Sequence, residues 1–245
     1  MPIGVIINAL AIIIGGLIGA KTGDRLSQEF KDKLNLIFAV CSMGMGISSI
    51  CLMENMPAVI LSLILGTIIG IVIHLGTLIE RGGVKLEQWM SGLMGGASAA
   101  SEAEQQERTA LLVTAVVLFC SSGTGIYGSM VSGMSGDHSI LIAKSILDLF
   151  TAMIFACSLG MVVSAIALPQ LVIFGALFAC ARLIFPLTTP AMINDFKACG
   201  GFLILATGFR IARIKMFPTA DMIPSMILVM PLSWLWAAHI MPLFA

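Results

Sequence analysis

The chain has 245 residues, of which 58% are hydrophobic and only 11% are charged. Soluble globular domains carry roughly 25% charged residues, so this composition excludes an ordinary soluble protein and indicates one that is embedded in a membrane. The formal net charge is zero, which gives no support to a nucleic-acid partner.

Apolar segments follow one another along the chain, each close to the roughly 20 residues that a helix needs to cross a bilayer. We therefore predict an all-α fold, a polytopic transmembrane helical bundle of about eight spans, in a single transmembrane domain over residues 1–245. A cytoplasmic loop is expected at about 80–109. The predicted spans cover residues 3–20, 34–53, 57–79, 110–132, 139–166, 169–187, 191–211 and 221–243.

The first predicted span has its basic residues, beginning with Lys21, after the apolar segment rather than before it. This order indicates a membrane span with its N-terminus outside, not a cleaved signal peptide. The loops after the first, third and seventh spans hold four, three and three basic residues, which is ten of the thirteen in the chain. Because basic loops stay in the cytoplasm, both termini are predicted to lie outside it. Asn8, inside the first span, is a candidate for a hydrogen bond between helices.

Some segments depart from a pattern of straight spans. Residues 84–94 carry apolar side chains at helical spacing and predict a short helix on the inner membrane surface. The fifth predicted span is long, so we expect it to be tilted or broken near Gly160. Pro224 and Pro231 interrupt the eighth.

A weak internal repeat relates the two ends of the chain. The sequence FAVCSMG (38–44) resembles FKACGGF (196–202), and MPAVILSL (56–63) resembles IPSMILVM (223–230). If spans one to three correspond to spans six to eight, the offset of five spans inverts one copy relative to the other. Inverted repeats are typical of secondary transporters. The similarity is short and gapped, so a shared helix-packing composition explains it equally well.

The second half of the fourth predicted span is rich in glycine and in hydroxyl side chains. Glycine at membrane depth either lets helices pack closely or marks an unwound stretch. Unwound backbone persists there only when it is buried in protein or lines a cavity. Both interpretations stay open. The residues concerned are Ser121, Ser122, Gly123, Thr124 and Gly125.

The fifth predicted span carries two charges, Lys144 and Asp148, on the same helix face as Thr151. Residues 134–139 form a short turn, so at about 1.5 Å per residue Asp148 lies at the depth of Gly123, near the middle of the bilayer. Lys144 can reach outward along its flexible stem, but the short Asp148 side chain cannot. A charge at this depth costs at least about 2.5–3.5 kcal/mol. Asp148 therefore needs a partner, a water-filled cavity or a proton.

These two segments predict a polar centre for a small solute or ion between the fourth and fifth spans, because ionisable residues inside a membrane favour a functional role. The alternative is a structural ion pair between Lys144 and Asp148 that holds helices together. The predicted substrate or ion-binding residues are Ser121, Ser122, Gly123, Thr124, Gly125, Lys144, Asp148 and Thr151.

Signatures of catalysis and of cofactor binding are absent from the sequence. It contains no HExxH, GxSxG, P-loop or dinucleotide-binding motif. Its six cysteines lie in apolar runs and show no CxxC spacing. The sequence therefore predicts no enzyme, no cofactor and no metal site.

Three stretches resemble a known family. They are LFCSSGTGIYGSMVSGMSGDHSILIAKSILDLFTAMIFACSLG (118–160), PLTTPAMINDFKACGGFLILATGFRIARIKMFP (186–218) and INALAIIIGGLIGA (7–20). Through them the chain is similar, over nearly its whole length, to the YqgA/YdfK-like bacterial inner-membrane proteins, a group of unknown function also described as candidate transport proteins. The resemblance implies a polytopic fold in the bacterial inner membrane and supplies neither a substrate nor site residues. The loop at 80–109 matches the family least.

The function predicted from these features is that of an inner-membrane transporter or channel for a small solute or ion. The alternative is a non-transporting membrane scaffold, sensor or assembly factor, in which Lys144 and Asp148 only hold helices together. The expected partners are the lipid bilayer and the small solute or ion, and a homo-oligomer is compatible with a chain of this size. The substrate, the coupling ion and the direction of transport are not specified by the sequence.

Overall fold

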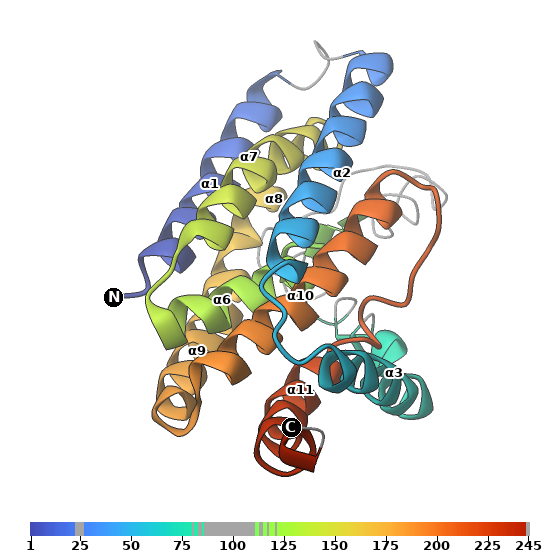
Figure 1. Cartoon of the computed structure of the whole chain (residues 1–245). Helices are drawn as coiled ribbons and strands as arrows, with labels where there is room; N and C mark the ends of the chain where they lie inside the picture. The colour runs from blue at the N-terminus through green and yellow to red at the C-terminus, as the bar shows by residue number, and fades with distance from the viewer. Residues whose placement is uncertain are drawn as a thin grey trace.

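The computed structural model describes residues 1–22, 27–79, 81, 82, 85, 111, 112, 115, 116, 118–120 and 122–243. Every regular element in these ranges is helical, which confirms the all-α class (Figure 1). The predicted surface helix at 84–94 and nearly all of the loop at 80–109 lie outside the described residues.

The helices fall into three groups along the chain. The first group is α1 (Ile3–Thr22), α2 (Gln28–Ile50) and α3 (Met56–Val72). The second is α6 (Gly123–Ser135), α7 (Ser139–Leu159), α8 (Val162–Ala165) and α9 (Ala167–Ile184), with a 3-10 turn at Phe185–Leu187. The third is α10 (Pro190–Ile211) and α11 (Pro224–Leu235), followed by a π-helical turn at Trp236–Ile240 and a 3-10 turn at Met241–Leu243.

Four helices in the described part of the chain are long and apolar enough to cross a membrane, by length and composition. They are Ile3–Thr22, Asp32–Ile50, Ser139–Leu159 and Val162–Leu187. These four support a helical membrane protein, whereas the count of eight spans stays a prediction. α3 and the helix at Pro224–Ile240 are apolar but shorter, and α6 has only 13 residues.

Two of the predicted spans are broken. α7 ends at Leu159, and Gly160 follows with a φ of +77°, a left-handed conformation that glycine adopts without strain. This confirms the expected break near Gly160. The predicted span at 110–132 is interrupted as well, because Ser122 has an extended backbone and its hydroxyl accepts a hydrogen bond from the backbone N–H of Gly125. Ser122 is thus the N-cap from which α6 begins.

The helices pack in pairs that are distant in sequence: α1 against α7, α2 against α10, α3 against α11 and α6 against α9. Figure 1 shows α1, α7, α2 and α10 as long ribbons side by side, with α3 and α11 below them. A Cβ on Gly15 of α1 would overlap the carbonyl oxygen of Leu149 on α7. The two backbones therefore touch, as small residues permit in membrane helices.

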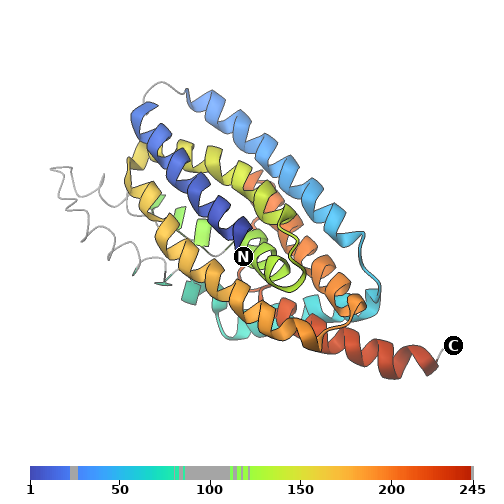
Figure 2. The same cartoon turned by 90° about the vertical axis from the view of Figure 1, so that its left-hand side faces the viewer.

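α1 has two faces of opposite character. Ile6, Leu10, Ile14 and Ile18, spaced four residues apart, are each more than 40% exposed, which suits contact with lipid. Asn8 on the other face is fully buried. Figure 2 shows the C-terminal helix extending away from the remaining helices. α1 therefore turns its polar Asn8 toward the interior of the bundle and its isoleucines outward.

Candidate functional site

Asp148 lies in the middle of α7 with its side chain almost completely buried. The Nζ atom of Lys144, one helical turn earlier, donates to its Oδ2 atom at 2.5 Å, and Lys144 is buried as well. The expectation that Lys144 reaches outward is therefore wrong, because its ammonium group turns toward the carboxylate. The i, i+4 spacing alone brings the two charges together.

Asn8 of α1 extends this pair to further helices. Its Nδ2 atom donates to Oδ2 of Asp148 at 2.8 Å, and its Oδ1 atom accepts a hydrogen bond from Nε2 of Gln170 on α9. Asn8 and Gln170 are both fully buried. A continuous chain of hydrogen bonds thus joins α7, α1 and α9. We call Lys144, Asp148, Asn8 and Gln170 the polar centre.

The series of hydrogen bonds ends at the side-chain amide of Gln170. No donor in the described part of the protein lies within hydrogen-bonding distance of the buried Oε1 atom of Gln170. Turning the amide of Asn8 around would set its oxygen against the carboxylate of Asp148, so the direction of the chain is fixed by Asp148. Leaving a buried acceptor unpaired costs about 1–3 kcal/mol, and such a group in a folded protein needs an explanation.

The start of α6 lies beside the polar centre. A Cβ on Gly125 would overlap the ring of Phe174 on α9 and would come within 3.0 Å of Cε of Lys144. A Cβ on Gly133 would likewise come within 3.0 Å of Ala181. α6 and α9 therefore run in the same direction, and Gln170, one turn before Phe174, lies level with the beginning of α6.

The structure gathers part of the predicted site. Lys144 and Asp148 form its charged pair, and Gly125 packs on Lys144, as the expected hairpin of the fourth and fifth spans requires. Ser122 caps α6, Gly123 is the first residue of that helix and Thr124 is buried. Thr151 donates its hydroxyl hydrogen to the carbonyl oxygen of Leu147 inside its own helix. Ser121 lies outside the described residues. A binding role for these residues stays a prediction.

Sequence reasoning missed Gln170, although a lone amide in the apolar run of α9 is a detectable signal. Cys120 is buried in the same apolar cluster as Ala9 of α1 and Ala152 of α7, so the segment before α6 lies close to the polar centre. Among the described residues, no group of three histidine, cysteine, aspartate or glutamate side chains is placed to hold a metal ion.

A second buried carboxylate, Asp195 of α10, was also missed. Its Oδ1 atom accepts hydrogen bonds from the backbone N–H groups of Glu54 and Asn55, both at 2.8 Å. Its Oδ2 atom accepts from Nδ2 of Asn55 at 2.8 Å and from the hydroxyl of Ser233 at 2.6 Å. Asn55 is the N-cap of α3, so the carboxylate also lies at the partially positive end of that helix. We call Asp195, Asn55 and Ser233 the carboxylate clamp.

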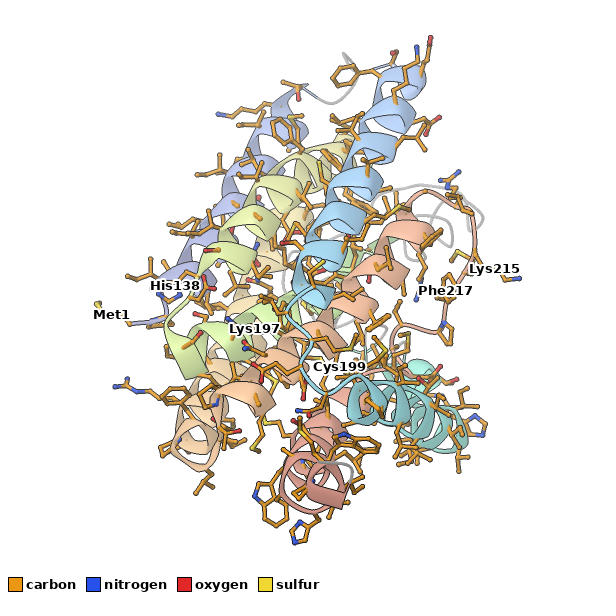
Figure 3. The ribbon with its side chains drawn as sticks, in the orientation of Figure 1. Met1, His138, Lys197, Cys199, Lys215 and Phe217 are labelled. Carbon is orange, nitrogen blue, oxygen red and sulfur yellow. The ribbon has the colours of Figure 1, made fainter. Side chains whose placement is uncertain are left out.

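The turn between α6 and α7 carries a third, more exposed set of polar groups. Asp137 accepts a hydrogen bond from the backbone N–H of Ser139 at 3.0 Å and lies 3.9 Å from Nζ of Lys197 on α10. Nδ1 of His138 is 2.6 Å from the hydroxyl of Ser132. Figure 3 labels His138 at this turn and Lys197 on α10. The backbone N–H of Ser139, followed by Lys197 and His138, lowers the pKa of Asp137 below its usual value of 3.8.

An open groove of about 340 Å³ lies between the end of α9 and α11. Its lining is mostly apolar and includes Met192, Met230 and Trp234. This groove offers no charged side chain to a solute, so the polar centre remains the candidate site.

Comparison with known proteins gives a family without an assigned function. Residues 3–234 match the family described as "Protein of unknown function (DUF554)". The chain is 46% identical over 238 residues to the uncharacterised protein YqgA of Escherichia coli K12, which covers 97% of this chain and 99% of YqgA. It is 28% identical over 231 residues to the uncharacterised membrane protein YdfK of Bacillus subtilis 168, which covers 92% and 93% of the two chains. No solved structure matches significantly.

Proposed function

Since the chain belongs to the DUF554 family, whose description assigns no function, we propose one from the polar centre: the protein is a transporter or channel that moves a small solute or ion across a membrane. The proposed function involves no enzymatic reaction. The solute or ion would interact with the polar centre, beside the first turn of α6.

One observation carries this proposal. A buried series of hydrogen bonds through four polar side chains crosses three helices of a membrane protein and ends at Oε1 of Gln170, an acceptor with no donor among the described residues. A purely structural network is expected to satisfy all of its members, since unsatisfied buried groups destabilise the fold. Interrupted helices are typical of the sites at which transporters bind a substrate, and the network lies beside the interruption before α6.

A second candidate function is favoured by the direct contact between Lys144 and Asp148. A scaffold, sensor or assembly factor needs only that these two charges neutralise each other and join α7 to α1 through Asn8. In that case the pair would have no reason to separate, and its loss would affect stability alone.

We further propose an inner-membrane location with the N-terminus outside the cytoplasm. The ten basic residues in the loops after the first, third and seventh predicted spans support this orientation. The description of the relative YdfK as a membrane protein and the exposed isoleucines of α1 support a bilayer as the surrounding medium. A homo-oligomer stays a prediction.

The proposal is tested by uptake into liposomes that contain the purified full-length protein. The probes are labelled urea, sodium ion, acetate and glycine, which represent a neutral solute, a cation, an anion and a zwitterion. We expect at least one of them to enter faster than into protein-free liposomes. Asp148→Asn should abolish this uptake, while Ser62→Ala, which removes a hydroxyl bonded within α3, should leave it unchanged.

Folding of each variant is checked by its elution volume and thermal unfolding in detergent. If Asp148→Asn does not fold, Gln170→Leu takes its place, because its shape is retained and no charge is left unpaired. The transport proposal is wrong if none of the four probes enters and the folded variants lose stability only. That result would support the scaffold.

A further inference from the structure

We propose that the polar centre receives a small zwitterionic solute, one that carries both an ammonium and a carboxylate group. This inference, which rests on the proposed function, names the chemical class of the solute. It follows from the charge of the polar centre, from its unpaired acceptor and from the tight packing around Gly125.

The charges of the polar centre select against solutes with a single charge. Lys144 and Asp148 are opposite in sign, in contact and buried, so together they are neutral. A lone cation bound to Asp148 would leave the ammonium of Lys144 without a partner. A lone anion bound to Lys144 would likewise leave the carboxylate of Asp148 without one. A buried charge without a counter-ion is strongly unfavourable. A zwitterion brings both charges, so each residue exchanges one partner for another and the interior stays neutral.

The acceptors suit the ammonium group. An ammonium group has three N–H donors and no acceptor. The carboxylate of Asp148 can take one of these donors in place of Lys144. The buried Oε1 atom of Gln170, which has no donor among the described residues, offers the ammonium group a second acceptor in this apolar interior. The ammonium group of the solute therefore supplies the donor that Oε1 of Gln170 lacks among the described residues.

The cationic end of the polar centre suits the carboxylate group. The stem of Lys144 packs on Gly125 in the first turn of α6, whose N-terminal end carries a partial positive charge. A lysine beside a helix N-terminus brings two positive ends together. A carboxylate that lies between them interacts favourably with both.

The packing limits the size of the solute. Gly125 has no room even for a Cβ, because the fully buried ring of Phe174 and the stem of Lys144 lie against it. A solute can bind near this turn only when the flexible stem of Lys144 moves aside, which favours a solute with a side chain of no more than a few carbon atoms. Glycine and alanine are the simplest probes that meet the conditions of charge and size.

Thermal unfolding of the purified protein tests the charge requirement. Glycine is compared with acetate and methylammonium, each of which lacks one of its charged groups, at equal concentration and ionic strength. We expect the melting temperature to rise in a saturable way with glycine or alanine and to stay constant with acetate, with methylammonium and with the bulky phenylalanine. A ligand that binds only the folded state stabilises it in this way. An equal rise with acetate or methylammonium alone, or no rise with either zwitterion, overturns the inference.

Variants test the residues. Gln170→Leu should raise the half-saturating glycine concentration roughly 10- to 150-fold, the effect of one hydrogen bond to a charged group, and Asp148→Asn should remove the response. Ser62→Ala, in α3, should respond like the unmodified protein. If Gln170→Leu folds and responds normally, the inferred role of its amide is wrong.

The liposome assay separates the two proposals. Uptake of urea, sodium or acetate that depends on Asp148, without any response to a zwitterion, overturns this inference and leaves the transport function standing. If a zwitterion raises the melting temperature but no probe is taken up, the transport function is overturned and the inferred zwitterion binding stands.

Discussion

The protein buries two aspartates in opposite ways. Asp148 meets one cation and one amide, whereas Asp195 meets four neutral donors and no cation among the described residues. A carboxylate has about four acceptor sites, and those of Asp195 are all engaged. The clamp is therefore complete and joins α10, α3 and α11. The partners of Asp148, in contrast, can be exchanged without breaking the backbone of any helix.

The largest effect is expected for removal of Asp148 while Lys144 stays. Asp148→Leu should lower the free energy of unfolding by about 3–5 kcal/mol, because a buried ammonium then lacks its counter-ion. The double variant Lys144→Met/Asp148→Leu should recover most of that loss, since replacing both members of a buried pair is often nearly neutral. Chemical unfolding in detergent measures both. A double variant no more stable than the single one would show that the two charges do not act as a pair.

The clamp should behave differently. Asp195→Asn should lower the free energy of unfolding by about 2–3 kcal/mol, because its new N–H groups face donors and buried donors lose their acceptor. No second substitution that alters a charge should rescue it, since no cation faces Asp195 in the described residues. Recovery of stability in Asp195→Asn/Lys197→Met, measured by the same unfolding experiment, would mean that the clamp depends on a charge after all.

The close packing of α1 on α7, which holds Asn8 next to Asp148, can be weakened by a substitution at neither of these two residues. Gly15→Ala should cost about 1–3 kcal/mol, because its Cβ overlaps the carbonyl of Leu149 and pushes α1 away from α7. Gly44→Ala is the matched control, because nothing lies within 4 Å of its Cβ. The control should change stability by less than about 1 kcal/mol. Equal losses in the two variants would argue against close packing of α1 on α7.

The smallest effect is expected at the exposed turn. The lowered pKa of Asp137 means that its contribution to stability is complete above pH 3.8 and is lost as the pH falls through its lower folded-state value. Asp137→Asn should therefore destabilise the protein at pH 7, by less than about 1 kcal/mol because the group is partly exposed. The difference should shrink as the pH is lowered from 3.8 toward 2. Melting temperatures at both pH values measure it, and a larger difference at pH 2 would contradict the assignment.

The sequence predicted the ion pair of Asp148 with Lys144, but it predicted none of the partners of Asp195. The Lys144–Asp148 contact is local, four residues along one helix, so helical spacing predicts it. The break at Gly160 is local as well. The clamp depends on residues 38 to 141 positions apart, and only the packing of α3 and α11 on α10 brings them together. Gln170 was missed for the same reason, because its partner Asn8 is 162 residues away.

The span count shows a further limit of sequence reasoning. Hydropathy over 110–132 suggests one continuous helix, yet Ser122 interrupts it, because its hydroxyl caps the helix that follows. The glycines Gly125 and Gly133 lie inside α6 and pack closely on α9, so the break falls at Ser122 and the packing interpretation holds for them. Local capping and long-range packing thus decide what apolar length alone cannot.

The spacing of the two asparagine–aspartate contacts has a consequence for biosynthesis. Asn8 and Asn55 each precede their aspartate by 140 residues. Chains are synthesised from the N-terminus at about 5–20 residues per second. Each asparagine is therefore incorporated several seconds before the aspartate that it contacts. Asn8 of α1 therefore has no aspartate partner until α7 has been made, and Asn55 of α3 has none until α10 has been made. Assembly of this bundle is completed from its C-terminal half.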